Sequence, residues 1–175
     1  MKRIALIYGS VLAALMCLNL VYVIHLMYTD PNLKSNDIAG YTIQIVIMSL
    51  TIFGIRNYRN KELNGTISFG KAFKVGAFIV LAGATLYVIF WLFYYYLAVP
   101  DFIDVFVPHA LKQIEACGAT ATEMAAKTEQ MNTLREMYKN PLFVVLITYM
   151  EVLPVGLIVA LVSALILKRK AVPAV

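Results

Sequence analysis

Four long stretches without charged side chains dominate the pattern of apolar and polar positions along the chain. They cover residues 4–29, 38–55, 75–100 and 140–167. A single acidic residue, Glu151, interrupts the last stretch. A helix of about 20 residues crosses a hydrocarbon layer of about 30 Å, and these stretches are apolar on every face instead of alternating as barrel strands do. The pattern therefore predicts an all-α integral membrane protein, a four-helix bundle with spans at about residues 4–28, 39–56, 74–98 and 141–167.

Composition narrows the class of protein further. Apolar residues make up 61% of the 175 positions and charged residues only 14%, whereas soluble domains carry about 45–50% and about 25%. A soluble, fibrous or disordered chain does not fit these values, because a core of this size cannot bury so many apolar side chains.

The placement of positive charge predicts an orientation. Basic residues gather before the first span, between the second and third, and after the fourth: Lys2, Arg3, Arg56, Arg59, Lys61, Lys71, Lys74, Lys168, Arg169 and Lys170. The other two connections are poorer in Lys and Arg. By the positive-inside rule we expect both termini and the loop 57–73 in the cytoplasm, and the segment 99–140 outside it. The first apolar run is too long for a signal peptide, so we expect an uncleaved first helix.

The predicted outer segment, residues 99–140, is too long to be a plain connection. Pro108 and Gly118 are expected to break it, leaving a short helix over residues 109–116. Thr120 and Glu123 have the spacing of a capping box and predict the start of a second helix. Asn140-Pro141 predicts the end of that helix and the start of the last span.

One apolar stripe marks the second of these helices: Met124, Met131, Leu134 and Tyr138. Two interpretations of the stripe are open. The helix binds a partner or covers a pocket, or it lies on the membrane surface or on the outer ends of the bundle. We favour the second, because an interfacial amphipathic helix needs no ligand.

The predicted cytoplasmic loop contains a motif that resembles a phosphate loop. Gly65 to Lys71 reads G-x-x-x-x-G-K, but Ala72 follows where that motif requires Ser or Thr, and a membrane helix precedes it instead of a strand. We therefore reject nucleotide binding. Four side chains at this site are instead candidates for contact with lipid headgroups or a partner, two aromatic and two basic. They are Phe69, Lys71, Phe73 and Lys74.

The same loop carries a family resemblance. The run Arg56-Asn57-Tyr58-Arg59, followed by Gly65-Thr66-Ile67-Ser68-Phe69-Gly70-Lys71-Ala72-Phe73, resembles the bacterial membrane proteins grouped as domain of unknown function 4199. The resemblance extends over most of the chain, including the four-helix layout and the long segment before the last helix. Because such proteins occur mainly in Bacteroidota, it implies a bacterial inner membrane protein. It implies no activity and no functional residues.

Glu151 is the leading candidate for a functional residue. An acidic side chain at mid-bilayer costs about 2.5–3.5 kcal/mol even on the milder scales, so it usually faces protein or water and is often functional. Counted along the helices, several polar side chains reach a similar depth or lie nearer the outer face: Asn19, Tyr22, His25, Gln44, Ser49 and Tyr87. Two interpretations are open. Either Glu151 exchanges a proton or binds a cation, assisted by Asn19, Tyr22 or His25, or it locks the bundle through hydrogen bonds to these groups.

Small residues and a proline shape the last span around Glu151. Pro154 is expected to bend or loosen the helix. Gly156, Ala160 and Ala164 form a small-residue face at four-residue spacing, which suits close helix packing. If the faces of Glu151 and of these small residues both contact protein, the last span is central in the bundle or lies at a subunit interface.

Other chemistry is weakly represented. Cys17 lies within the first predicted span and Cys117 in the predicted outer segment, so we expect no internal disulfide, and Cys117 is available only for a link between chains. The His, Cys and acidic residues lack metal-ligand spacing, which predicts no metal and no cofactor. Trp91 and residues 94–96 are typical of an interfacial aromatic belt.

These observations predict a non-enzymatic protein, since no Ser-His pair, paired carboxylates or HExxH motif is present. The leading hypothesis is a small inner-membrane accessory or scaffold protein that binds other proteins or lipids. The alternative is a small oligomeric proton-coupled transporter or exporter that uses Glu151. Expected partners are the lipid bilayer and a protein partner or a second copy of the chain, and no nucleic acid.

Overall fold

The computed structural model describes residues 1–30 and 37–169, and this part of the chain forms seven helices and no strand. The helices are α1 (Lys2–Thr29), α2 (Asp37–Met48), α3 (Thr51–Glu62), α4 (Phe69–Leu97), α5 (Phe102–Ala116), α6 (Ala121–Tyr138) and α7 (Pro141–Leu167). Of the basic residues used to predict orientation, Lys170 lies outside the described residues.

Four helical segments are long and apolar enough to cross a membrane, as the sequence predicts. They are α1, α2 together with α3, α4, and α7. Large apolar side chains on their outer surfaces are exposed, among them Leu18, Met150 and Ile166. Exposed apolar surface on this scale fits contact with lipid and not with water. The prediction of an all-α protein with four spans is confirmed, and this is a multi-pass membrane protein.

The helices extend past two of the predicted spans. α3 continues to Glu62 and α4 begins at Phe69, so only residues 63–68 connect them. Within this connection Asn64 and Gly65 have positive φ values of 49° and 84°, a left-handed geometry that asparagine and glycine tolerate best.

The second span is broken into α2 and α3 at Ser49 and Leu50. The Ser49 hydroxyl donates to the Ile45 carbonyl at 2.8 Å, and the Leu50 N–H donates to the carbonyl three residues back, Ile47, at 3.1 Å. A serine bonded back to its own helix and a tightened turn both bend helices. This break was not predicted from the sequence, where residues 39–56 read as one continuous span.

α4 is the central helix, and α1 packs along one side of it through glycines. A Cβ at Gly9 of α1 would lie 2.8 Å from Ala82 Cβ and 3.0 Å from the Gly83 nitrogen. The two backbones therefore approach closely where both helices lack side-chain bulk, as in other small-residue membrane contacts. Leu12 and Ile79 are fully buried beside this contact.

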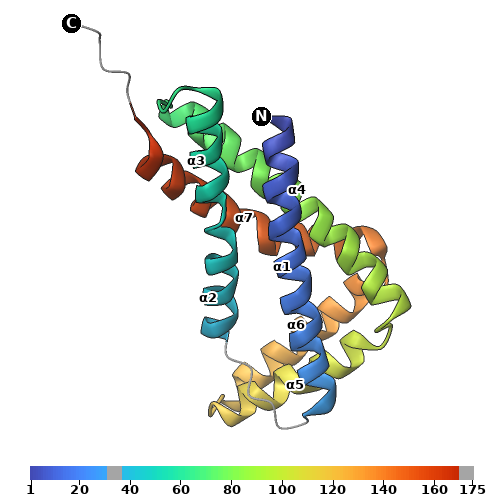
Figure 1. Cartoon of the computed structure of the whole chain (residues 1–175). Coiled ribbons are helices and arrows are strands. Elements are labelled where there is room, and N and C mark those ends of the chain that lie inside the picture. Colours follow the sequence, from blue (N-terminus) through green and yellow to red (C-terminus); the bar gives the residue numbers. More distant parts are fainter. Residues whose placement is uncertain (31–36, 170–175) are drawn as a thin grey trace, which may run out of the picture.

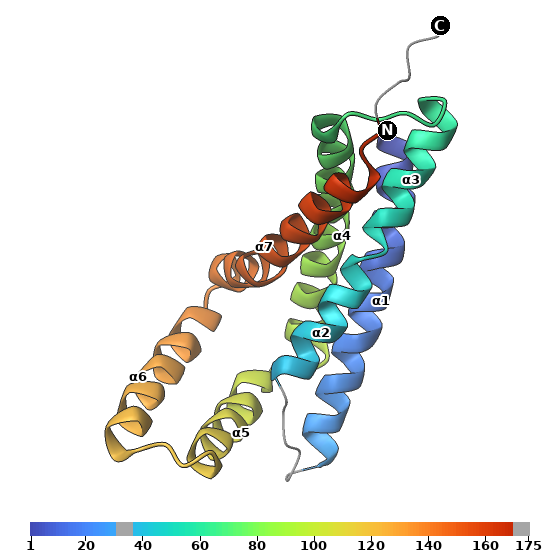
Figure 2. The same cartoon turned by 90° about the vertical axis from the view of Figure 1, so that its left-hand side faces the viewer.

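α7 crosses another side of α4 obliquely, as Figures 1 and 2 show. Here the expected small-residue face is buried: Gly156, Ala160 and Ala164. A Cβ at Gly76 of α4 would lie 3.0 Å from Ala160 Cβ, and one at Gly156 would overlap Val80 Cγ1. The last span is therefore not the central helix of the bundle. That position belongs to α4, which has the largest buried share of the four spans.

The two ends of the bundle differ in the segments that they carry. The N-terminus, the connection 63–68 and the end of α7 lie at one end, and α5 and α6 lie at the other (Figure 1). At the first end Ile67 pairs with Arg169 through two backbone hydrogen bonds of 2.8 and 3.0 Å. A guanidinium nitrogen of Arg59 also donates to the Leu167 carbonyl at 3.2 Å. These bonds join α3, the connection 63–68 and the end of α7.

α5 and α6 form an antiparallel hairpin that projects from the other end of the bundle (Figure 2). The expectation that Pro108 would break this segment is wrong, because α5 begins at Phe102 and continues through it. Proline removes one helical hydrogen bond, but the burial of Ile103 and Val107 holds this stretch of α5 in place.

Local signals define the other ends of the hairpin as predicted. Gly118 has a φ of 82°, and the N–H groups of residues 118 and 119 donate to the carbonyls of Glu115 and Ile114 in a Schellman motif. Thr120 and Glu123 form the predicted capping box, and Asn140 caps α7 by accepting from the Leu142 N–H. Met131, Leu134 and Tyr138 of the predicted stripe pack against the cluster that contains Ile103 and Val107.

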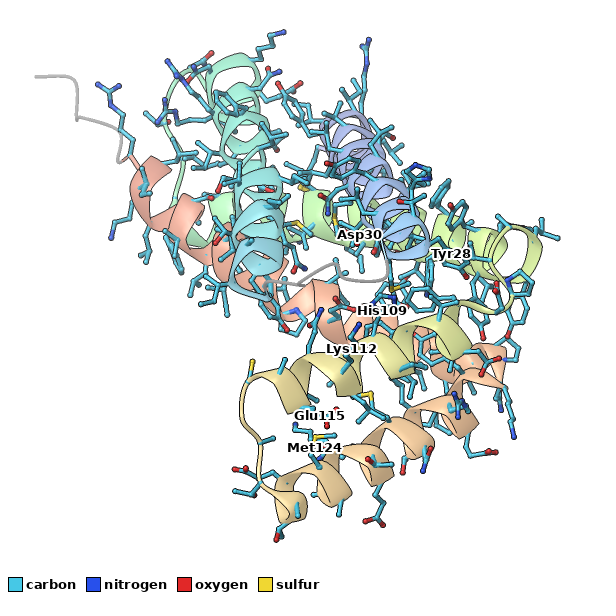
Figure 3. All side chains as sticks on the ribbon, turned by 90° about the horizontal axis from the view of Figure 1, so that it is seen from below. Tyr28, Asp30, His109, Lys112, Glu115 and Met124 are labelled. Carbon is cyan, nitrogen blue, oxygen red and sulfur yellow. The ribbon has the colours of Figure 1, made fainter. Side chains whose placement is uncertain are left out.

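Polar contacts also join the hairpin to α1. The Tyr28 hydroxyl donates to the Asp101 carboxylate at 2.9 Å, and Asp104 pairs with Arg135 at 3.2 Å. Seen from this end, α5 lies between α1 and α6 (Figure 3), with His109 and Lys112 on the turns of α5 toward the end of α1 that carries Asp30. The first of these two contacts fixes the start of α5 beneath the end of α1, and the second holds α5 against α6.

Candidate binding pocket

A pocket of about 440 Å³ lies among α1, α2, α4, α5 and α7, in the half of the bundle nearer the α5–α6 hairpin. Its polar lining consists of Asn19, Tyr41, Gln44, Tyr87 and Glu151. Its apolar lining consists of Met16, Leu20, Val23, Ile47, Phe106 and Val152. We call this cavity the Glu151 pocket. Its volume falls within the range of about 300–1,000 Å³ that is usual for small-molecule sites.

The packing of α7 on α4 directs Glu151 into the pocket. The small-residue face fixes which side of α7 meets α4, and the neighbouring residue Val152 is almost fully buried. The Tyr149 hydroxyl donates to the Thr85 hydroxyl of α4 at 2.9 Å, which fixes the register of the two helices two residues before Tyr87. Glu151 itself is exposed on the pocket wall. Its carboxyl is therefore open to a molecule that occupies the pocket.

The structure brings together some of the residues proposed from the sequence and leaves others apart. Asn19 and Glu151 both line the pocket, together with Gln44 and Tyr87. Tyr22 is 62% exposed on another face of α1, and His25 is exposed as well. Neither lines the pocket. Tyr22 and His25 were predicted from their depth along the helix alone. Successive residues are turned by about 100° around the helix axis, and these two side chains point away from the pocket.

Tyr41 and Phe106 line the pocket but were missed in the sequence. Tyr41 precedes Gln44 by three residues, so helical spacing places both on one face of α2, a signal that was available. Phe106 comes from α5, which stacks it on Phe102 at 5.5 Å. No short-range pattern connects it to Glu151, since the contact depends on how the hairpin folds back.

The polar groups of the pocket retain unused hydrogen-bonding capacity. No hydrogen bond joins Asn19, Tyr41, Gln44, Tyr87 or Glu151 to another residue of the described chain. Unpaired polar groups are costly in a membrane interior. This lining therefore favours a polar or charged group in the pocket over apolar contents alone.

The charge of Glu151 extends its influence to α6. Burial raises the pKa of Tyr138 to about 12, and the negative charge of Glu151 acts in the same direction. Among the described residues that line the pocket there is no Lys, Arg or His. Glu151 is thus the one acidic side chain in this lining, and its ionised form would attract cations into the pocket.

The second candidate surface lies at the opposite end of the bundle. Phe69 and Phe73 occupy the first turns of α4 and stack with ring centroids 6.4 Å apart. Phe73 packs partly against the core, while Lys71 and Lys74 are exposed. The four residues thus form a short aromatic and basic surface on the start of α4, at the end of a span, where lipid headgroups lie.

Comparison with known proteins identifies the family. Residues 3–169 match the family described as Protein of unknown function (DUF4199). The chain belongs to this family. No curated protein and no solved structure matches it. The match covers both the Glu151 pocket and the start of α4, so both surfaces of this DUF4199 protein lie within the family region.

The lining of the Glu151 pocket in this DUF4199 protein offers acid–base and electrostatic groups. Within residues 1–30 and 37–169 no three His, Cys, Asp or Glu side chains are placed to hold a metal ion. The pocket offers one carboxyl, two amides, two phenols and an apolar wall. Such a set can bind a ligand and exchange a proton.

Proposed function

We propose that this protein is a small, non-enzymatic transporter or exporter that binds its substrate in the Glu151 pocket and exchanges it for a proton on Glu151. The observation that carries the proposal is the exposed carboxyl of Glu151 in an otherwise uncharged membrane pocket. An acidic residue that only locked the bundle would have hydrogen-bond donors around it, whereas no described residue donates to Glu151. For this reason we place transport ahead of the accessory role that composition alone favours.

We further propose that the protein resides in the bacterial inner membrane with both termini in the cytoplasm. The end that carries the N-terminus, residues 63–68 and Arg169 is rich in Lys and Arg, which supports this orientation by the positive-inside rule. The hairpin of α5 and α6 then lies outside. Four spans enclose little space, so a homo-oligomer is the expected form, with the lipid bilayer as the other partner and no nucleic acid or cofactor.

A second candidate is an accessory protein that binds a protein or lipid partner. The projecting α5–α6 hairpin favours it, because α6 has no buried residue and presents a free surface. The surface of Phe69, Lys71, Phe73 and Lys74 offers a further contact to anionic headgroups. In this case the carboxyl of Glu151 has only a structural role and substitution by glutamine affects stability alone.

Infrared spectroscopy of the carboxyl group distinguishes the two candidates. We expect a protonated carboxyl band in lipid that Glu151→Gln removes. It should shift promptly in D₂O and disappear as the pH is raised while the protein remains folded. Glu129→Gln, at an exposed position on α6, is the matched control, because it also removes one carboxyl but should leave the Glu151 band in place. A Glu151 band that neither exchanges in D₂O nor titrates would mean that the carboxyl has no access to solvent protons. That result would refute the transport function and favour the accessory role.

A further inference from the structure

The lining of the Glu151 pocket indicates a class of ligand. We infer that the substrate is an organic cation with an apolar body, held with its positive charge at Glu151 and its apolar part against the apolar side chains of the lining. This inference rests on the proposed function and adds the chemistry of the substrate to it. The juxtaposition that carries it is one carboxylate, three aromatic rings and an apolar wall in a single cavity.

The charge of the lining selects against anions. When it is ionised, Glu151 is the one charged side chain among the described residues of the wall. In a membrane environment of low dielectric, an anionic headgroup or metabolite would meet this charge without a compensating Lys or Arg. A cation, in contrast, supplies the counter-charge that the carboxylate lacks among its described neighbours.

Aromatic and amide groups around the carboxylate favour a nitrogen-centred or similar diffuse charge. Tyr41, Tyr87 and Phe106 reach the pocket from three different helices, and aromatic faces attract cations. Asn19 and Gln44 add amide oxygens, which accept hydrogen bonds from an ammonium group. The ring faces suit quaternary and protonated amines alike, and the amide oxygens add hydrogen bonds to a protonated amine.

The size and wall of the cavity argue against an inorganic ion. A metal ion of the Ca²⁺ or Mg²⁺ type takes six or more oxygen ligands at close range, whereas half of this lining is apolar. Met16, Leu20 and Val23 of α1 line it together with Ile47 and Val152. A volume of about 440 Å³ accepts a molecule with several rings or a branched aliphatic body.

Paired hydrophobic ions of the same shape provide a direct test. Tetraphenylphosphonium and tetraphenylborate differ in charge and hardly in size. The full chain is placed in lipid nanodiscs, with empty nanodiscs as the blank, and saturable binding of each ion is measured by equilibrium dialysis. We expect the cation to bind and the anion neither to bind nor to displace it. Comparable binding of the anion would overturn the inference.

Variants assign the binding to the pocket. Glu151→Gln should weaken binding of tetraphenylphosphonium by about tenfold or more, the loss usual for a charged partner, and Glu151→Asp should restore most of it. Phe106→Leu should weaken it severalfold, while Phe93→Leu, at a 63% exposed position on α4, should have no effect. Circular dichroism confirms that each variant is folded. Equal affinity in Glu151→Gln and wild type would refute the site.

Failure of this inference and failure of the proposed function give different results. If tetraphenylphosphonium does not bind the folded wild type, the ligand class is wrong, whatever the infrared band of Glu151 shows. If the carboxyl band is sealed and silent, the transport function is wrong, whatever binds to the protein. Binding that depends on the charge at position 151 supports the inference.

Discussion

Replacing Gly9 by alanine tests the close approach of α1 to α4. A Cβ at this position would lie 2.8 Å from Ala82 Cβ, and 3.0 Å from both the Gly83 nitrogen and the Ile79 oxygen. These atoms belong to the backbone or are Cβ atoms, so no change of rotamer relieves the overlap. The two helices must separate instead.

The distances give the size of the effect. Ordinary contact begins at 3.4 Å, so Ala82 Cβ must move away from position 9 by 0.6 Å, the difference between 3.4 and 2.8 Å. A gap of about 0.5–1 Å removes roughly a quarter to a half of each dispersion contact along the interface. Overpacking of this kind costs about 1–3 kcal/mol, which is the loss of unfolding free energy that we expect for Gly9→Ala.

The assay is unfolding in mixed micelles of dodecylmaltoside and sodium dodecyl sulfate. Far-ultraviolet circular dichroism and the fluorescence of Trp91, the single tryptophan of the chain, follow the transition. Gly70→Ala is the matched control, because a Cβ at this helical position meets nothing within 4 Å. Alanine there should be neutral or stabilise by up to about 1 kcal/mol. If Gly9→Ala is as stable as Gly70→Ala, the inferred contact between the helices is wrong.

Three further predictions concern the hairpin. Hydrogen bonds from the Thr120 N–H and hydroxyl hold the pKa of Glu123 below 4.5. The stability that this carboxylate gives to α6 should therefore be present above pH 4.5 and lost as the pH falls through the lowered pKa. Hydrogen exchange in α6 of the wild type and of Glu123→Gln should therefore differ at neutral pH and become equal in acid. A difference between the two that persists in acid would contradict this. Pro108→Ala should slow hydrogen exchange in α5 by restoring the missing backbone hydrogen bond, which raises the stability of the helix by up to about 3 kcal/mol. Faster exchange would show that the proline stabilises α5. Tyr28→Phe should speed hydrogen exchange at the start of α5. The expected loss of local stability is at the lower end of about 0.5–1.5 kcal/mol, because both partners of the hydrogen bond are exposed. Unchanged exchange would mean that the bond to Asp101 contributes nothing.

The features that were predicted correctly from the sequence depend on interactions between residues close together in the chain. The four spans follow from the length of charge-free sequence, because a charge in hydrocarbon is costly whatever surrounds it. The capping box of Thr120 and Glu123 and the Asn140 cap depend on neighbours within a few residues. Such features depend little on tertiary structure, so the pattern was sufficient to place them.

Features that depend on distant contacts were missed or misplaced. Pro108 lies inside a helix because the packing of α5 outweighs the lost hydrogen bond. Tyr22 and His25 were placed near the depth of the pocket along α1, but their side chains do not point into it. The packing of α1 on α4 decides which face of α1 meets the pocket. Phe106 belongs to the pocket through the fold of the hairpin. A single sequence fixes depth in the membrane but not rotation about each helix axis.

The most direct test of the central claim is proton release on cation binding. Tetraphenylphosphonium is added to the folded protein in weakly buffered nanodiscs with a pH-sensitive dye. If Glu151 exchanges a proton for the cation, protons should appear in step with the cation bound, and Glu151→Gln should release none. Binding without proton release, or release that is unchanged in Glu151→Gln, would contradict the account.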